Sequence, residues 1–460
     1  MAMRMWEAER PIAAVILAAG KGTRMKSQRH KVLHEIGGKP MIEHLLDQVD
    51  RLGAERTVVI VGEGREQVEA RLGTRVSYAV QDQQLGTGHA VMQAKGALDG
   101  FEGDVLVMFG DVPFVRAETM MGMLKRLHGE DAPAVVVLGF KPYDPLQYGR
   151  VIARDGRITK MVEFKDATDE ERSCPLCNSG LMAVRSDMLF KLLGEIDNEN
   201  AQGEFYLPDV VNVAIASDIP TAVTVTSDPD EVAGINSRAE LADAERRFQQ
   251  AARAKAMAEG ATLVAPETVF FSHDTVLGQD VLVEPNVVFG PGVTVADNVI
   301  IHAFSHLEGA LLKEHVQIGP YARLRPGAVL EEGSKIGNFV EMKNAVLGEG
   351  AKANHLTYLG DATVGANANI GAGTITCNYD GYFKHKTVIG PGAFIGSNSA
   401  LIAPVKIGAD AIVAAGSAVS RDVSDGELRM VRAEQLVKPG WADRFHDAMK
   451  KKKEQERKDG

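Results

Sequence analysis

Apolar side chains, all aliphatic except Phe289, recur at every sixth position in three stretches of the second half of the chain, at residues 277–301, 318–342 and 389–413. A period of six fits neither an α-helix nor an ordinary strand, whereas a fixed short period is typical of stacked repeats. In a hexapeptide solenoid each unit is a short strand with a corner, and one aliphatic side chain points into a narrow prism. The period therefore predicts a parallel β-helix with three units in each coil, rather than a β-sandwich.

The six-residue rhythm is interrupted at two places. The spacing falls to five between Leu359 and Val364, and an insertion at residues 377–384 precedes Ile389. Segments that leave a rigid solenoid commonly carry binding or catalytic residues. We therefore expect this insertion to belong to a functional site.

The composition of the 460-residue chain is that of a globular protein, with 45% hydrophobic and 25% charged residues. A net charge of −11 argues against a general nucleic-acid-binding protein, because such binding needs clustered cations. No apolar run approaches the length of a membrane span, and residues 1–10 lack the apolar core of a signal peptide. These features favour a cytoplasmic protein without stable membrane insertion.

The three cysteines are too few for a disulfide framework. Cys174 and Cys177 have the spacing of a CxxC motif, but no second pair of zinc ligands lies nearby in the sequence. We interpret them as thiols in a reducing compartment.

Between residues 11 and 225, apolar runs alternate with stretches of helical composition, beginning with residues 13–17, 41–52 and 56–61. Such alternation predicts βα units and a largely parallel sheet covered by helices on both faces. Ligands of these sheets bind beyond the carboxyl ends of the strands. The first strand leads directly into a loop, residues 17–25, which we expect to lie at that edge.

This loop has the sequence Leu-Ala-Ala-Gly-Lys-Gly-Thr-Arg-Met. It is neither a Walker A loop, which would end in Gly-Lys-Ser/Thr, nor a GxGxxG motif, because Met25 occupies the third glycine position. Its small residues expose backbone N–H groups, and Arg24 and Lys31 add two cations that can neutralise a triphosphate. The loop is therefore predicted to bind phosphate.

The loop resembles the LxxGxGTRM signature of the sugar-nucleotide pyrophosphorylases. With its hexapeptide half, the chain is similar over residues 12–441 to the bacterial bifunctional N-acetylglucosamine-1-phosphate uridyltransferase/glucosamine-1-phosphate N-acetyltransferase family. The resemblance implies a Rossmann-like, GT-A-like α/β nucleotidyltransferase domain followed by a left-handed parallel β-helix. It further implies a homotrimer that supplies UDP-N-acetylglucosamine for peptidoglycan and lipopolysaccharide precursors.

The resemblance implies a first site in the N-terminal half. Arg24 and Lys31 are expected to be catalytic there, and Asp111 and Asn236 to hold Mg²⁺, which prefers oxygen ligands. The implied reaction is in-line attack of a sugar phosphate on the α-phosphorus of UTP, with pyrophosphate leaving. The expected substrate-binding residues, which read the nucleotide and the sugar, are Leu17, Ala18, Ala19, Gly20, Gln81, Gly86, Thr87, Phe109, Gly110, Gly149, Glu163 and Asn178.

A second polar set lies in the hexapeptide half. Arg325 and Lys343 each follow an inward aliphatic residue and lie 18 residues apart, which is one coil. Stacked at one corner, the two cations repel each other unless an anion such as a sugar phosphate lies between them. We expect His355 to lie a further turn along in the same basic pocket, where a histidine suits deprotonation of a sugar amine.

The resemblance makes His355 the general base of an acetyl transfer from acetyl-CoA to glucosamine 1-phosphate. The residues expected to bind the sugar phosphate are Arg325, Lys343, Tyr358, Asn369, Asn378 and Tyr379. The residues expected to contact acetyl-CoA along the solenoid are Ala372, Ser397, Ala415 and Arg432.

These expectations divide the chain into a uridyltransferase domain at residues 1–236, a linker helix at 237–259, the β-helix at 260–425 and a C-terminal segment at 426–460. The lysine run of the last segment is interpreted as a solvated or disordered tail.

Two other readings stay open. One is a sugar-1-phosphate nucleotidyltransferase whose β-helix is purely regulatory, against which the basic set around His355 argues. The other is a scaffold that keeps the fold without catalysis, against which Arg24, Lys31 and Asp111 argue.

Overall fold

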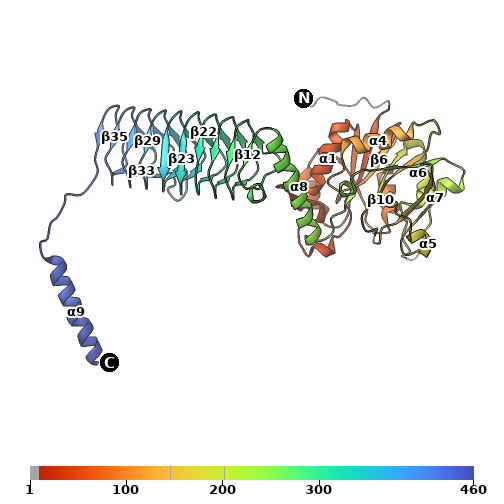
Figure 1. Cartoon of the computed structure of the whole chain (residues 1–460), viewed down its shortest axis with the longest axis horizontal. Helices are drawn as coiled ribbons and strands as arrows, with labels where there is room; N and C mark the ends of the chain where they lie inside the picture. Colours follow the sequence, from red (N-terminus) through yellow and green to blue (C-terminus); the bar gives the residue numbers. More distant parts are fainter. Residues whose placement is uncertain (1–9, 146, 201, 460) are drawn as a thin grey trace. The chain divides into compact units, whose positions relative to one another are not determined.

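The computed structural model describes residues 10–145, 147–200 and 202–459, so the expectation about a signal peptide in the first residues lies outside the described part. The chain divides into two compact units, Met1–Ala252 and Arg253–Gly460. Figure 1 shows helices around a sheet in the first unit and a ladder of short strands in the second. Within the described ranges, no helix combines the length and the apolar character needed to cross a membrane.

The first unit is built on one nine-stranded sheet of order β5-β4-β1-β6-β10-β7-β11-β9-β8. Its strands are β1 (Ile12–Leu17), β4 (Arg56–Val61), β5 (Ser77–Val80), β6 (Asp104–Phe109), β7 (Val135–Phe140), β8 (Arg150–Arg154), β9 (Arg157–Val162), β10 (Cys177–Arg185) and β11 (Thr221–Val225). The strands from β5 to β6 are parallel as expected, whereas β10 runs antiparallel to β6 and β7.

Both faces of this sheet are buried. Alternate residues of β1 enter two separate cores, with Ile12, Ala14 and Ile16 in one and the residues between them in the other. The first core is covered by α1 (Met41–Leu52), α2 (Arg65–Leu72) and α4 (Ala117–Leu127), and the second by α3 (Thr87–Met92), α6 (Ser186–Leu193) and α7 (Asp209–Ala216). The short α5 (Asp169–Arg172) follows β9. A strand buried on both sides explains the uninterrupted apolar run of residues 12–17.

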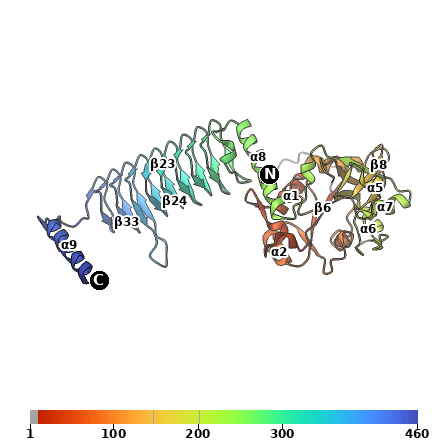
Figure 2. The same ribbon diagram turned by 60° about the horizontal axis from the view of Figure 1, so that its bottom comes forward.

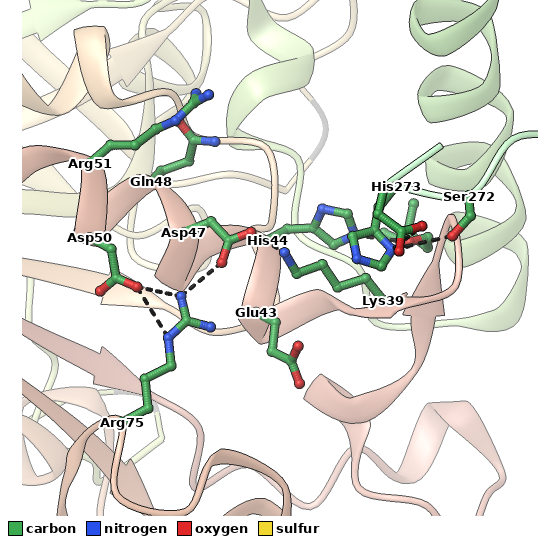
Figure 3. A network of polar contacts seen from close by, with 12 residues as sticks. Lys39, Glu43, His44, Asp47, Gln48, Asp50, Arg51, Arg75, Ser272 and His273 are labelled. Carbon is green, nitrogen blue, oxygen red and sulfur yellow. Dashed lines mark hydrogen bonds and ion pairs between the residues drawn. The ribbon is translucent and has the colours of Figure 1, made fainter. Parts of the chain in front are cut away.

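Charged side chains form a network beside α1 (Figure 3). Arg75 donates to Asp47 at 2.8 Å and to Asp50 at 2.5 Å, and Lys39 pairs with Asp47. Burial would raise the pKa of Asp47, but its bonds to Lys39 and Arg75 outweigh this effect and lower the pKa. Such half-exposed pairs contribute about 0–1 kcal/mol each, so the network adds little to the stability of the fold.

The second unit is a parallel β-helix of three sheets, which the chain visits in a fixed order. The first sheet runs from β12 (Thr262–Leu263) to β37 (Leu428–Arg429), the second from β15 (Val288–Phe289) to β36 (Ala418–Val419) and the third from β13 (Val276–Leu277) to β34 (Val405–Ile407). Each strand pairs in parallel with its copy one coil later, as Leu324 does with Met342. The hexapeptide prediction is confirmed.

The inward aliphatic ladder is longer than the sequence pattern predicted. Leu307 and Leu312 are fully buried and continue the ladder between Ile301 and Ile318, where the period of six had seemed to stop. The step from Leu307 to Leu312 is five residues, as is the step from Leu359 to Val364. A corner can therefore lose one residue while the neighbouring strands keep their register.

The expected linker, the end of the solenoid and the C-terminal tail each contain a regular element. Helix α8 (Arg238–Ala258) stands where the linker helix was expected. The last strand of the solenoid ends at Arg429, slightly beyond the expected boundary at 425. The lysine run belongs to a helix, α9 (Trp441–Asp459), whose described side chains are exposed, which agrees with the solvated and not with the disordered form of the tail that we expected.

Candidate active sites

Two adjoining cavities, of about 270 and 400 Å³, open at the carboxyl ends of β1 and β6. Thr87, Phe109, Asp111 and Glu204 line both of them. The first cavity also contains Leu17, Ala18, Ala19, Gly20, Lys31, Gln81 and Gly86, and the second contains Gly149, Glu163 and Asn178. The predicted nucleotide residues and the predicted sugar residues therefore line neighbouring cavities with a common wall. Gly110 is held beside them by its backbone N–H, which donates to Leu17 O at 2.9 Å.

Lys31 lines the first cavity and contacts both predicted metal ligands. Its Nζ donates to Asp111 Oδ2 at 2.5 Å and to Asn236 Oδ1 at 3.0 Å. Two oxygens from distant parts of the chain thus converge on one cation. The side chains of Lys31 and Asp111 are both largely buried, which strengthens their attraction.

The phosphate loop is bent back on itself so that its glycine packs on the lysine. Gly22 has φ +59°, and a Cβ atom there would lie 2.6 Å from Lys31 Cβ. Only glycine allows this approach without strain. Arg24, in the 3-10 turn Thr23–Met25, is exposed and is not among the residues that line either cavity.

Gln81 closes the nucleotide side of the first cavity. It is 5% exposed, and its Nε2 donates to Gly86 O at 3.0 Å. Gly86 has φ +110° and lies against the backbone of Phe205, where a Cβ would collide. The side-chain amide of Gln81 is therefore fixed against the segment that leads into α3.

Glu163 faces the backbone of Gly149 in the second cavity, where a Cβ on the glycine would lie 3.1 Å from Glu163 Oε1. Burial, with smaller contributions from Asp209 and Asp166, raises the pKa of Glu163. Asn178 donates its backbone N–H to Gly149 O at 2.9 Å, and its side-chain Oδ1 accepts from Gly180. A carboxylate and an amide thus bracket a space in which sugar hydroxyls can be bound.

The stacked cations of the β-helix lie at the corner that follows the second sheet. Arg325 donates its backbone N–H to Met342 O at 2.8 Å, which places Lys343 directly after it in the next coil. Glu341 lies 2.9 Å from Arg325 Nη1 and neutralises part of its charge. Lys384, from the insertion, and then Arg325 lower the pKa of Lys343 by repulsion. Three cations therefore gather at this corner, one more than the sequence predicted.

His355 does not belong to that corner, which corrects our expectation of a single column. It ends β26 (Lys352–His355) of the first sheet, and the residue paired with Lys343 in the next coil is Gly360. His355 follows Lys343 by 12 residues, which is two thirds of a coil. His355 and the cations therefore lie at opposite edges of the second sheet, with Tyr358 of β27 (Tyr358–Gly360) on the strand between them.

The expected acetyl-CoA residues continue the corner of His355. Gly373 donates to His355 O, Asn398 to Ala372 O and Gly416 to Ser397 O, so each expected contact lies one coil after the previous one. Ala415 precedes Gly416, and a Cβ on Gly416 would lie 3.7 Å from Arg432 Cδ. The residues Ala372, Ser397 and Ala415, which we expected to contact acetyl-CoA, form a single line of small side chains that leads to His355.

Residues 14–165 match the MobA-like NTP transferase domain, and residues 274–309 and 386–421 match the bacterial transferase hexapeptide (six repeats) family. A protein of Sphingopyxis alaskensis named "Bifunctional protein GlmU" is 67% identical over 97% of this chain and 99% of its own length. The protein of that name from Novosphingobium aromaticivorans is 73% identical over 96% of this chain and 98% of its own. The chain belongs to the GlmU family.

A solved structure of UDP-glucose pyrophosphorylase complexed with UDP-glucose aligns with 52% of this chain and 99% of that protein, at 20% identity and a TM-score of 0.43. The GlmU family membership confirms a bifunctional uridylyltransferase and acetyltransferase, with one matched domain for each activity. It rules out a purely regulatory β-helix and a non-catalytic scaffold.

The remaining residues that we expected to bind the sugar phosphate in this GlmU family member are spread over two sheets. The Tyr358 hydroxyl lies over Gly360 and so points toward the cation corner. Asn378 follows β30 (Ile375–Cys377) and donates to Asp361 Oδ2 at 2.5 Å, whereas Tyr379 is exposed. Figure 2 shows a loop that projects from the ladder of strands near β33 (Ala400–Ile402). Asn369 is paired with Lys352 on the first sheet, three residues before the level of His355, so it does not share the face of Tyr358.

Sequence reasoning missed several residues of these sites. Glu204 lines both cavities and Tyr206 lines the second, and Gln84 donates to Ala19 O at 2.8 Å within the first. Lys384 was overlooked in the insertion. The polar run before α7, residues 197–206, was the available signal for Glu204, but nothing in its spacing connects it to the phosphate loop.

Exposed apolar side chains stand directly beside His355. Phe304, Tyr321 and Phe339 stack at centroid distances of 4.9 and 5.2 Å, and Leu356 occupies the next coil. All four have φ between +49° and +62°, and each is about half exposed. Left-handed backbone costs an ordinary L residue roughly 1–2 kcal/mol. The equivalent corners of other coils hold Asn286, Gly373 and Asn398, which adopt it readily.

Proposed function

We propose that this chain acetylates glucosamine 1-phosphate with acetyl-CoA in its β-helix and then joins the product to UMP in its N-terminal unit. The second step uses UTP and releases pyrophosphate, and the final product is UDP-N-acetylglucosamine for cell-wall precursors. The observation that supports it most is the second sheet of the solenoid, which has a cation cluster along one edge and His355 with a line of small residues along the other.

In the first reaction, the three cations Arg325, Lys343 and Lys384 bind the sugar phosphate, which relieves their mutual repulsion. Tyr358 lies between this corner and His355 and orients the sugar ring. His355 accepts the proton that the amine loses as its nitrogen attacks the acetyl carbonyl, and coenzyme A leaves as the thiol. Ala372, Ser397 and Ala415 let the pantetheine arm approach the backbone, and Arg432 binds its phosphates.

In the second reaction, Gln81 and the Gly86–Thr87 backbone read the uracil in the first cavity. Glu163, Asn178 and Gly149 bind the N-acetylated sugar in the second. Lys31 and Arg24 neutralise the phosphates, so that the sugar phosphate oxygen attacks the α-phosphorus with pyrophosphate leaving opposite. Arg24 lies outside the described cavities and reaches the phosphates only from the exposed turn that carries it.

Asp111 and Asn236 are assigned to Mg²⁺. Their oxygens fit a hard divalent cation, because both already converge on the ammonium of Lys31 at hydrogen-bonding distance. When bound, the ion would supply charge neutralisation at the triphosphate.

The enzyme is proposed to be a cytoplasmic homotrimer with domain boundaries at residues 236, 259 and 425. The aromatic ladder of Phe304, Tyr321 and Phe339 supports self-association, because exposed aromatic side chains at left-handed positions carry a cost that burial against another copy would offset. The ladder adjoins His355, so the acetyl site would lie at the edge of that interface.

The test measures free thiol in a mixture of pure protein, glucosamine 1-phosphate and acetyl-CoA, and pyrophosphate in a second mixture of the same protein, N-acetylglucosamine 1-phosphate, UTP and Mg²⁺. His355→Ala is expected to abolish thiol release and to spare pyrophosphate formation from N-acetylglucosamine 1-phosphate. Asp111→Ala is expected to do the reverse. Loss of both activities in either variant would contradict two independent sites.

A further inference from the structure

The segment that carries Lys31 is held at two points by one side chain from a distant part of the chain. Arg238, in the first turn of α8, donates through Nε to Met25 O at 3.2 Å, and its Nη1 lies 3.2 Å from His34 Nδ1. Met25 ends the phosphate loop and His34 follows Lys31 by three residues. The guanidinium therefore ties together the two ends of residues 25–34.

The histidine partner can only accept in this contact. An arginine N–H donates and has no lone pair, so Nδ1 of His34 accepts and the neutral ring carries its proton on Nε2. His34 is 4% exposed, and burial, followed by the charge of Arg238, lowers its pKa. The ring is therefore a neutral, fixed anchor for the arginine.

The same turn of α8 also fixes the other partner of Lys31. The Glu240 carboxylate accepts from the backbone N–H groups of Asn236 at 2.5 Å and Ser237 at 2.9 Å. Asn236 in turn accepts from Lys31 Nζ. Lys31 and Asn236 are thus positioned against each other by two side chains that lie two residues apart on one helix.

We infer that Arg238 is a positioning residue for uridylyl transfer, which holds Lys31 at Asp111 and Asn236 by fixing both ends of its loop. This inference rests on the proposed role of Lys31. Arg238 is not among the residues that line the two cavities, so it acts through Lys31 and not on the substrate. A displacement of about 1 Å in a catalytic group can cost about 100-fold in rate.

The test compares Arg238→Met with Arg246→Met, a matched control on the same helix whose arginine pairs with Asp243 at 2.5 Å. Arg238→Met is expected to lower kcat for uridylyl transfer by about 10- to 100-fold with a change in KM of less than about threefold. Acetyl transfer by the same protein should stay within about twofold in both variants. Arg238→Lys keeps a hydrogen-bond donor, so its kcat for uridylyl transfer should lie between the values of Arg238→Met and the unaltered protein.

His34→Ala and the double variant Arg238→Met/His34→Ala complete the design. If the two residues act as one unit, the double variant loses no more kcat than Arg238→Met alone. The inference would be overturned if the kcat losses of the two single variants multiply in the double variant. It would also be overturned if Arg238→Met keeps an unchanged kcat or changes KM alone. Lys31→Gln separates the inference about Arg238 from the proposed function. If Lys31→Gln keeps full uridylyl transfer, the role of Lys31 itself is wrong. If Lys31→Gln is inactive while Arg238→Met is fully active, only the role of Arg238 is wrong.

Discussion

Asn338 Oδ1 lies 2.6 Å from Nδ1 of His355, one coil away at the same corner of the solenoid. The amide oxygen accepts the Nδ1 proton and leaves Nε2 of the neutral ring with a free lone pair. The histidine that we propose as general base of acetyl transfer is thus oriented by a neutral partner and not by a carboxylate.

Replacing Asn338 with alanine is expected to lower kcat of acetyl transfer by about 10-fold, because the imidazole loses the bond that fixes its tautomer and orientation. The KM for the sugar phosphate should change little, since the cation corner is untouched. Steady-state thiol release measures both values. Uridylyl transfer by the same preparation is the control, and an unchanged kcat for thiol release would show that His355 needs no such partner.

Glu163→Gln is expected to raise the KM for N-acetylglucosamine 1-phosphate by about 10-fold while it stabilises the fold at neutral pH. The pKa of Glu163 is raised in the folded chain, so its ionised form is disfavoured there. The protonated Glu163 side chain contributes to the free energy of unfolding. This contribution is fully present below the unfolded pKa near 4.5 and is lost as pH rises through the folded pKa. Thermal unfolding of both proteins between pH 4 and pH 8 should give curves that separate as pH rises, with the variant more stable.

Lys343→Ala is expected to raise the KM of acetyl transfer for glucosamine 1-phosphate by about 10-fold or more, with a smaller effect on kcat. Inorganic phosphate should raise the Tm of the unaltered protein, because an anion relieves the repulsion of Lys343 by Lys384 and Arg325. The phosphate shift should shrink in Lys343→Ala and in Lys384→Ala. Lys313→Ala, elsewhere on the solenoid, serves as the control, and an equal shift in all four proteins would rule out this corner as the anion site.

The triple variant Phe304→Asn, Tyr321→Asn and Phe339→Asn is expected to reduce the molecular mass in solution to that of one chain. Asparagine tolerates the left-handed backbone of these positions, so the isolated solenoid should keep its thermal stability. Phe394→Asn, at a similarly exposed phenylalanine outside the ladder, should leave the mass unchanged. Light scattering measures the mass, and a triple variant of unaltered mass would place any assembly contact elsewhere.

The architecture of both units was predictable because each depends on a local pattern. A strand covered on both faces needs an unbroken apolar run, and a prism needs one inward aliphatic residue per strand. The six-residue spacing of the inward residues failed where a corner is one residue shorter, as between Leu307 and Leu312. His355 was assigned to the wrong corner for a different reason, because its spacing of 12 residues from Lys343 was not compared with the 18 residues of a full coil.

The contacts that complete the sites were not predictable from local patterns. Glu204 lines the same cavities as Asp111 only because a long connection before α7 returns to the carboxyl end of the sheet. Lys384 reaches Lys343 because the insertion folds back through the pairing of Tyr379 with Lys384. Arg238 contacts Met25 and His34 across more than 200 residues. Each depends on tertiary structure that no short motif encodes.

The insertion at residues 377–384 lengthens one coil while Thr363 still pairs with Val388 and Val364 with Ile389. Strands before and after it thus remain in register despite the extra chain. A solenoid of this kind can evolve a new specificity loop at one corner in a single genetic event, because the added residues neither enter the prism nor move the residues already lined up along its edges.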